Sequence, residues 1–200
     1  MNYYQNRRTI RLKNYDYGRS GLYFITICTE DHQQIFGKII NKSMVLNNAG
    51  LIVQKCWLNI PKYCLGITLH EYIIMPNHIH GIIEITKPNA GANNHSPEYN
   101  VPNNNTTVDE KCCLDLAYDN RAYSDTPLQK SLRSPSKTIG SIVRGFKIGV
   151  MKWFRENMTV KYPVGKTIWQ RNYHDQIIWN DNLHKKITEY IKSNVENWDK

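Results

Sequence analysis

The sequence has neither the paired cysteines of a disulfide scaffold nor an apolar run long enough to cross a membrane. Its five cysteines are Cys28, Cys56, Cys64, Cys112 and Cys113, and no C-x-x-C spacing occurs among them. This pattern indicates neither a disulfide framework nor a zinc ribbon and is typical of a reducing compartment. The first eight residues lack the apolar core of a signal peptide, and no stretch approaches the roughly 20 apolar residues of a membrane span. We therefore expect a cytoplasmic protein with no membrane partner.

Acidic side chains are few compared with basic ones. The 200 residues include 17 Asp and Glu against 26 Lys and Arg, which gives a formal net charge of +9. This excess favours a polyanionic partner, nucleic acid ahead of a membrane surface, although a surface that is basic for solubility alone would give the same count. The length fits a single domain spanning 1–200. Within it, the Asn- and Pro-rich stretch 87–135 predicts a polar, flexible insertion.

Apolar periodicity predicts an α+β fold. A β-branched and aromatic run at 21–29 predicts a central strand, and two apolar runs that meet at the turn 76–77 predict a strand pair. The other predicted elements are a hairpin at 35–46, a helix from Asn47 or Asn48 to about Tyr63, a helix from Ser136 to about Asn157, an extended segment at 167–179 and a final helix capped by Asn180 or Asp181. This order favours a ferredoxin-like antiparallel sheet with helices on one face, plus a C-terminal helix.

Two histidines open the second strand of the pair. Side chains alternate between the faces of a strand, so His78 and His80 point the same way while Ile79 points into apolar packing. Two neutral imidazoles on one strand face can hold one divalent metal. An isolated His-x-His is more often a pair of polar residues on a solvated strand face, but the strands around this one are too apolar for an open surface.

A tyrosine and an asparagine on the final helix complete the candidate site. Tyr190 and Asn194 are four residues apart and share one helix face. If that face packs beside the sheet, an amide oxygen joins the imidazoles as a third ligand for Mg²⁺ or Mn²⁺ and leaves positions open for phosphate oxygens. The phenol is then the nucleophile candidate. Most of the thirteen tyrosines must be packing residues, and the pairing with Asn194 singles out Tyr190.

This combination favours phosphoryl transfer on DNA. A phenol has a pKa of about 10 and is a weak nucleophile at neutral pH until its proton is removed, and a divalent metal can polarise the scissile phosphate. Attack would give a 5′-phosphotyrosine and release a 3′-hydroxyl. Because the covalent bond retains the energy of the phosphodiester, a later 3′-hydroxyl could rejoin the strand without ATP.

Basic residues supply the candidate DNA contacts, and some of them alternate with tyrosines near the N-terminus. The candidates are Arg7, Arg8, Arg11, Lys13, Arg144, Lys147, Arg171, Lys185 and Lys186. Basic side chains hold phosphates and aromatic rings stack on unpaired bases, so these residues could bind single-stranded nucleic acid. Ordinary solvated surface positions would explain the same residues.

Five motifs, in this order, resemble the HUH single-tyrosine transposases, especially the REP-associated tyrosine transposases and their insertion-sequence relatives. The motifs are RRTIRL at 7–12 with YDY at 15–17, YFITIC at 23–28, MPNHIHG at 75–81, IWQRNY at 168–173, and EYI at 189–191 continuing to Asn194. The resemblance extends from about Arg7 to Asn194, apart from the insertion.

The resemblance implies a ferredoxin-like fold and a Mg²⁺- or Mn²⁺-dependent single-strand DNA endonuclease that recognises hairpins of repetitive palindromes. It also implies that His78 and His80 bind the metal, that Tyr190 is the nucleophile and that Asn194 is the third ligand. Gln176 stands where many relatives have a histidine, and the asparagine-proline that follows the nucleophile in many relatives is absent. Insertion-sequence relatives imply a homodimer and repeat-associated ones a monomer.

Three alternatives remain open from the residues alone. Tyr173 lies nearer to the segment containing Gln176 and is a rival nucleophile. A DNA-hairpin-binding regulator would keep the fold and the charge without cleaving. A metal-dependent hydrolase would combine the histidines with an activated water, and Glu84 shares their strand face.

Overall fold

A computed structural model describes residues 15–86, 138–158 and 166–198. The elements of this part of the chain are β1 (Gly21–Cys28), the 3-10 turn η1 (Glu30–His32), β2 (Gly37–Ile40), β3 (Ser43–Leu46), α1 (Asn48–Leu58), α2 (Ile60–Tyr63), β4 (Ile67–Met75), β5 (His78–Ile85), α4 (Ile139–Asn157), β6 (His174–Ile178), α5 (Asp181–Ser193) and the 3-10 turn η2 (Val195–Asn197). The predicted insertion and the predicted DNA contacts Arg7, Arg8, Arg11 and Lys13 lie outside the described residues. Among the described helices, none has the length and apolar character needed to cross a membrane.

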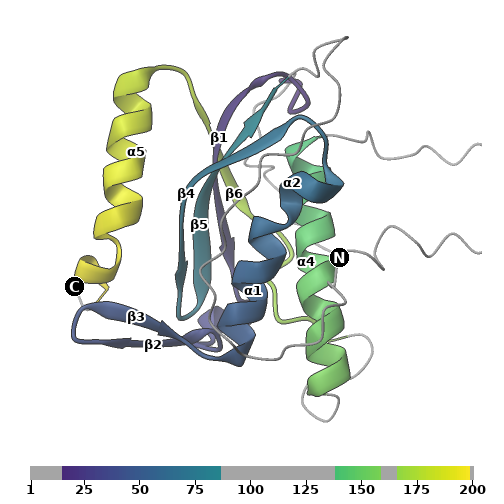
Figure 1. Cartoon of the computed structure of the whole chain (residues 1–200), viewed down its shortest axis with the longest axis vertical. Coiled ribbons are helices and arrows are strands. Elements are labelled where there is room, and N and C mark those ends of the chain that lie inside the picture. Colours follow the sequence, from purple (N-terminus) through teal and green to yellow (C-terminus); the bar gives the residue numbers. More distant parts are fainter. Residues whose placement is uncertain (1–14, 87–137, 159–165, 199–200) are drawn as a thin grey trace, which may run out of the picture.

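Four strands form one antiparallel sheet in the order β4-β5-β1-β6, and β2 with β3 forms a separate two-stranded sheet. Apart from the β2–β3 hairpin and α2, the chain runs strand, helix, strand, strand, helix, strand, which is the ferredoxin-like arrangement. Figure 1 shows α1 and α4 on one side of the sheet and α5 on the other. The predicted α+β class, with an antiparallel sheet and a C-terminal helix, is confirmed.

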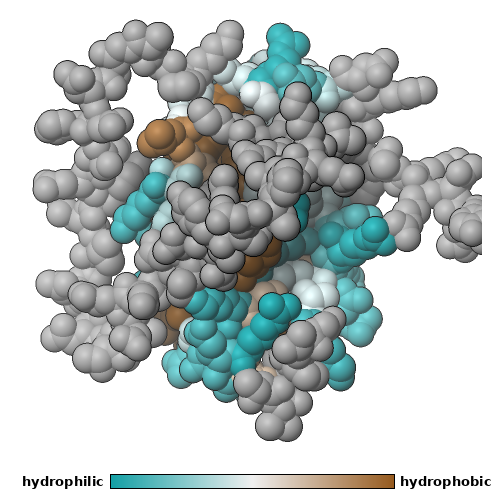
Figure 2. Space-filling model, turned by 90° about the vertical axis from the view of Figure 1, so that its right-hand side faces the viewer, coloured by the Kyte–Doolittle hydropathy of each residue, from teal (hydrophilic) through white to brown (hydrophobic). Residues whose placement is uncertain are grey.

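The main core lies between the sheet and the helices α1 and α4. The residues of β1 and β5 that face this core are two positions apart along each strand, because successive side chains point to opposite faces. They pack against Trp57 of α1 and Phe146 of α4, whose rings meet edge to face with centroids 5.6 Å apart. The strand residues of this core include Tyr23, Ile25, Ile27, Ile79 and Ile83, each at most 1% exposed. Seen from the α4 side, hydrophobic side chains appear in patches between hydrophilic ones (Figure 2).

A smaller cluster holds α5 against the opposite face of the sheet. Its buried members are Ile82 of β5, Ile178 of β6, and Ile187 and Ile191 of α5. An ion pair between Lys192 and Glu71 of β4, with 3.6 Å between nitrogen and oxygen, adds to this contact. The face of α5 that reaches the sheet is therefore narrow compared with that of α4.

Polar caps set where the helices begin. The side chain of Asn47 accepts a hydrogen bond from the Gly50 N–H at the start of α1, and Asn180 does the same for Leu183 of α5. The predicted start of a helix at Ser136 is wrong, because Thr138 caps α4 through a reciprocal capping box with the residue three positions on.

Two other predicted elements differ from the structure. The helix expected to run unbroken to Tyr63 divides at Asn59 into α1 and α2, and Pro61 occupies the first turn of α2, where its missing N–H costs no hydrogen bond. Of the extended segment 167–179, only His174–Ile178 joins the sheet.

Candidate active site

The turn between β4 and β5 places two imidazoles together on the face of the sheet that carries α5. His78 is the first residue of β5, directly after the turn. Alternation buries Ile79 completely in the main core and turns His78 and His80 to the other face. Their ring centroids lie 4.5 Å apart. The shared face that the alternation predicts is therefore the one observed.

Each imidazole is hydrogen-bonded through Nδ1 to a neighbouring oxygen. In His78 the partner is Oδ1 of Asn77 at 2.6 Å, and in His80 it is Oγ1 of Thr26 at 2.8 Å, from the adjacent strand β1. An amide oxygen can only accept a hydrogen bond, so Nδ1 of His78 carries the proton. We assign the proton of His80 to Nδ1 as well, so that the hydroxyl oxygen of Thr26 accepts the hydrogen bond from it. Both Nε2 atoms then present lone pairs, as metal-ligating histidines do.

Burial keeps both imidazoles neutral. It lowers the pKa of His78 to about 4, with a further lowering from the nearby His32. It lowers the pKa of His80 to about 3, with a further lowering from His78. Since the charged form of a buried histidine is disfavoured, both rings are unprotonated and able to bind a metal at neutral pH.

Helix α5 brings a phenol to this pair. The hydroxyl oxygen of Tyr190 lies 3.4 Å from Nε2 of His80, and the two ring centroids are 5.3 Å apart. Phe24 of β1 stacks on His80 and meets the Tyr190 ring edge to face. Tyr190 is nevertheless 47% exposed. Its hydroxyl is thus positioned by aromatic contacts while the side chain remains open to a large substrate.

The end of α5 reaches His78. Asn194 follows α5 directly, and its side chain lies close enough to the His78 ring to favour the protonated imidazole, against the larger effect of burial. Trp198, beyond η2, stacks on His78 with ring centroids 5.9 Å apart. The predicted set His78, His80, Tyr190 and Asn194 therefore lies around one point at the end of the sheet.

The donor set at this point fits a divalent metal. Nε2 of His78 is buried, and no group among the described residues forms a hydrogen bond of normal distance and angle with it. Burying a nitrogen lone pair without a partner costs free energy unless a ligand binds to it. No three His, Cys, Asp or Glu side chains gather in the described part of the chain, so a third ligand has to be of another type. The amide oxygen of Asn194 is one that Mg²⁺ and Mn²⁺ accept.

The two rival residues lie elsewhere. Tyr173 packs against the main core, with Nζ of Lys147 6.0 Å from the centre of its ring. Glu84 lies six residues beyond His78 on β5, where its carboxylate pairs with His70 at 2.8 Å. The structure brings neither of them to the histidine pair.

The described basic candidates are spread over both faces. Arg144 is exposed on α4, whereas Lys185 and Lys186 are exposed on α5, across the sheet. Arg171 is exposed before β6. Nζ of Lys147 donates to the backbone carbonyls of residues 170 and 172, at 2.7 and 3.2 Å, and burial lowers its pKa to about 8. DNA contact by these residues stays a prediction.

Sequence reasoning missed the residues that orient the histidines. The role of Asn77 could have been inferred from the sequence, because Asn77 directly precedes His78 in a turn and asparagine side chains in turns hydrogen-bond to neighbouring residues. Thr26 is 54 residues away from His80, and only the register of β1 with β5 pairs them. Phe24 shares the face of Thr26 and needs the same register. Nothing in the sequence pointed to Trp198.

Comparison with known proteins gives one clear relative. An uncharacterized protein of Haemophilus influenzae is 40% identical over 194 residues, which covers 97% of this chain and 91% of that protein. No protein-family model matches the sequence.

Two solved structures of related shape bear on the fold. A REP-associated tyrosine transposase, solved bound to a REP hairpin, matches with a TM-score of 0.51 and 12% identity over 92% of this chain and 72% of its own. A proposed transposase of Deinococcus radiodurans matches with a TM-score of 0.43 and 12% identity over 92% of this chain and 95% of its own. The predicted resemblance is confirmed at the level of the fold. The chain belongs to one family with the Haemophilus influenzae protein, and it has the fold of the REP-associated tyrosine transposases.

Proposed function

We propose that this protein is a metal-dependent single-stranded DNA endonuclease and strand transferase that acts on hairpin DNA through a 5′-phosphotyrosine. The observation that carries the proposal is the convergence of the Tyr190 hydroxyl with the paired imidazoles of His78 and His80. The likeness of the fold to a transposase bound to a DNA hairpin supports it, and so does the formal charge of +9.

Each residue of the site has a distinct part in the step. The Tyr190 oxygen forms a bond to the scissile phosphorus while the bond from phosphorus to the 3′ oxygen breaks, and the proton lost by the phenol is balanced by the proton that the departing oxygen takes up to become a 3′-hydroxyl. Thr26 and Asn77 hold the imidazoles through Nδ1, so that both Nε2 lone pairs face the site. Phe24 keeps the phenol in line by its edge-to-face contact.

His78, His80 and Asn194 are the residues that would hold Mg²⁺ or Mn²⁺. When bound, the ion polarises the phosphate and stabilises the charge that develops on its oxygens. The neutral state of both imidazoles supports this assignment, because a protonated histidine cannot bind a metal.

The test is covalent capture of DNA. Incubation of the protein with a single-stranded DNA hairpin and Mn²⁺ is expected to give a protein–DNA adduct, and peptide mapping should locate the bond at Tyr190. Tyr190→Phe removes the attacking oxygen and is expected to abolish the adduct. Tyr173→Phe is the matched control and should leave it intact.

Three outcomes would overturn the proposal. An adduct that persists in Tyr190→Phe would refute the nucleophile. Hairpin binding that survives His78→Ala, with no adduct at any metal concentration, would identify a DNA-binding regulator instead, and freely diffusing cleavage products without an adduct would identify a hydrolase that uses water.

A further inference from the structure

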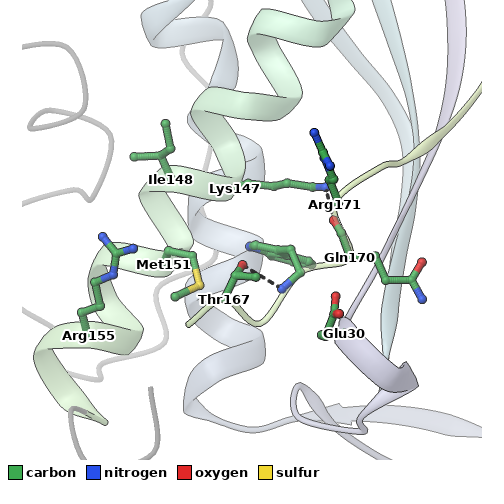
Figure 3. A pocket seen from close by; sticks show the side chains of 9 residues that line it. Glu30, Lys147, Ile148, Met151, Arg155, Thr167, Gln170 and Arg171 are labelled. Carbon is green, nitrogen blue, oxygen red and sulfur yellow. Dashed lines mark hydrogen bonds between the residues drawn. The ribbon is translucent and has the colours of Figure 1, made fainter. Parts of the chain in front are cut away.

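A pocket of about 410 Å³ lies between α4 and the segment that precedes β6. It is formed by the second half of α4, the segment that precedes β6 and the start of η1 (Figure 3). Its volume is within the range of sites for small organic ligands, about 300–1,000 Å³. None of the residues in the proposed active site lines it.

The lining combines cations with an apolar floor. Figure 3 shows Arg155 and Arg171 on opposite sides, with Met151 between them. Ile148 is 47% exposed here, although it is a large apolar residue. Among the described residues neither guanidinium has an ion-pair partner, and both side chains are exposed. Guanidinium groups without partners beside exposed apolar surface match an anionic ligand that also has an apolar ring.

One wall of the pocket also carries an acidic group. Glu30, the first residue of η1, contributes to the lining opposite the apolar floor. A carboxylate accepts hydrogen bonds from exocyclic amino groups of bases, which a simple phosphate ligand would not offer. The mixture of cations, apolar surface and one acceptor is therefore more suited to a nucleotide than to an inorganic anion.

The pocket is connected to the histidine pair by short contacts. The Gln170 N–H donates to the carbonyl of Cys28 at 3.0 Å, and Cys28 is the cross-strand neighbour of His78. The Gln170 side chain also meets the His32 ring at 3.2 Å, and His32 is close enough to influence His78. These contacts place the pocket wall formed by Gln170 next to the ends of β1 and β5, where the histidine pair begins.

We propose that this pocket binds one nucleotide of the single-stranded DNA that flanks the hairpin, with its phosphates on Arg155 and Arg171 and its base over Ile148 and Met151. The inference rests on the proposed function, since it takes DNA as the partner and places the strand beside the cleavage site. Lys147 is a positioning residue, because its hydrogen bonds to the carbonyls of residues 170 and 172 fix the wall next to Arg171.

The test compares two DNA hairpins, one blunt and one with a single-stranded flank, by fluorescence anisotropy in EDTA. The unchanged protein is expected to bind the flanked hairpin more tightly. The double variant Arg155→Gln/Arg171→Gln should lose about tenfold in affinity for the flanked hairpin, with a salt slope lower by about 1.4, or about 0.7 for each phosphate contact on a single strand. Its affinity for the blunt hairpin should not change.

Two further variants make the result specific. Lys55→Gln/Lys62→Gln removes the same charge from α1 and α2, outside the pocket, and should bind both hairpins as the unchanged protein does. Ile148→Glu places a negative charge on exposed apolar surface and should weaken only the flanked complex. A flank with an abasic site should be bound more weakly than an intact flank, because the base then lacks its apolar contact.

Two results would overturn the inference. Equal losses on blunt and flanked hairpins would make the arginines general phosphate contacts, and an unchanged affinity for the flanked hairpin would remove them from the interface. Because the binding is measured without metal, either result is independent of adduct formation by Tyr190. Failure of the adduct assay alone would count against the proposed function and leave the pocket assignment standing.

Discussion

Single hydrogen bonds decide what the two imidazoles can do. The Nδ1 contacts of His78 and His80 differ in origin: Asn77 is the neighbouring residue in the turn, whereas Thr26 comes from the adjacent strand. In both cases the oxygen partner directs the lone pair of Nε2 into the site. Partners of this kind fix the orientation and raise the basicity of a metal-binding histidine, and their loss typically costs 10–100-fold in metal affinity.

Thr26→Val is expected to weaken Mn²⁺ binding by about 10–100-fold while the protein stays folded. Valine has nearly the shape of threonine, but it cannot accept the hydrogen bond from Nδ1 of His80, so the ring is free to change tautomer and orientation. Isothermal titration calorimetry measures the affinity. Thr68→Val, on β4, is the control and should bind Mn²⁺ normally. An equal affinity in Thr26→Val would show that Thr26 does not orient the ligand.

Acid is expected to destabilise the metal-free protein through the same two residues. Burial lowers the pKa of His78 to about 4 and that of His80 to about 3, against about 6.5 in an unfolded chain. Below pH 6.5 the unfolded state binds protons first, so stability that is fully present above pH 6.5 is lost as the pH falls towards 4. The loss is at most about 1.4 kcal/mol per histidine for each pH unit.

Urea unfolding in EDTA between pH 7.5 and 5 measures this loss. The double variant His78→Gln/His80→Gln lacks both groups, and its stability should therefore fall less steeply with pH over the same range. Parallel pH profiles for the two proteins would assign the acid sensitivity to other groups.

At the scale of the elements, strand β5 is held in place by one close approach. A β-carbon at Gly81 would lie 2.3 Å from Cζ2 of Trp57, a buried ring that cannot move aside. Gly81 directly follows His80, so the packing of α1 against the sheet sets the position of the histidine strand.

Gly81→Ala is expected to lower the free energy of unfolding by about 1–3 kcal/mol, the usual cost of inserting a methyl group into a filled core. The matched variant is Gly145→Ala in α4, where nothing lies within 4 Å of the added β-carbon. It should stabilise the protein by about 0.5–1 kcal/mol, since alanine is the better helix former. Chemical denaturation gives both values, and changes of the same sign would contradict the argument.

The elements were largely predictable because their signals are local. The β-branched and aromatic run at 21–29, the apolar runs that meet at 76–77 and the polar caps Asn47 and Asn180 depend on neighbouring residues only. The errors have local causes too. The first helix ends at Asn59, before Pro61, and the capping box of Thr138 with Ser141 starts α4 after the predicted position Ser136.

The site was predictable only in part. The period of two in β5 and the spacing of four in α5 placed His78 with His80 and Tyr190 with Asn194, each on one element. That the two pairs meet depends on which face of the sheet α5 covers, and no local pattern determines this. Thr26 and the pocket depend on strand register and on the packing of distant segments, which a single sequence does not contain.

For the whole molecule, the two apolar clusters differ greatly in size. The cluster that joins the sheet to α1 and α4 contains most of the buried residues, whereas α5 contributes two buried residues, Ile187 and Ile191, and the partly buried Leu183 to the other. Segments with few buried contacts open with a smaller free energy than the global unfolding. Helix α5 should therefore detach locally while the rest of the molecule remains folded.

Hydrogen exchange with mass spectrometry tests this expectation. Amides of α5 should exchange at least about tenfold faster than those of α4, a difference of about 1.4 kcal/mol in opening free energy. Lys192→Ala removes the ion pair with Glu71 and should speed exchange in α5 without changing that of α4. Identical protection of the two helices would show that they open as one unit.

Because α5 is weakly attached, the position of the phenol and the stability of the fold can change independently, although most enzymes have to balance activity against stability. Substitutions at the contact of α5 with β4 would change the fraction of time that the phenol spends beside the imidazoles, yet the scaffold made by the larger cluster would keep its stability. Under the proposed function, the rate of strand breakage could therefore drift over generations, up or down, in a protein that goes on folding equally well.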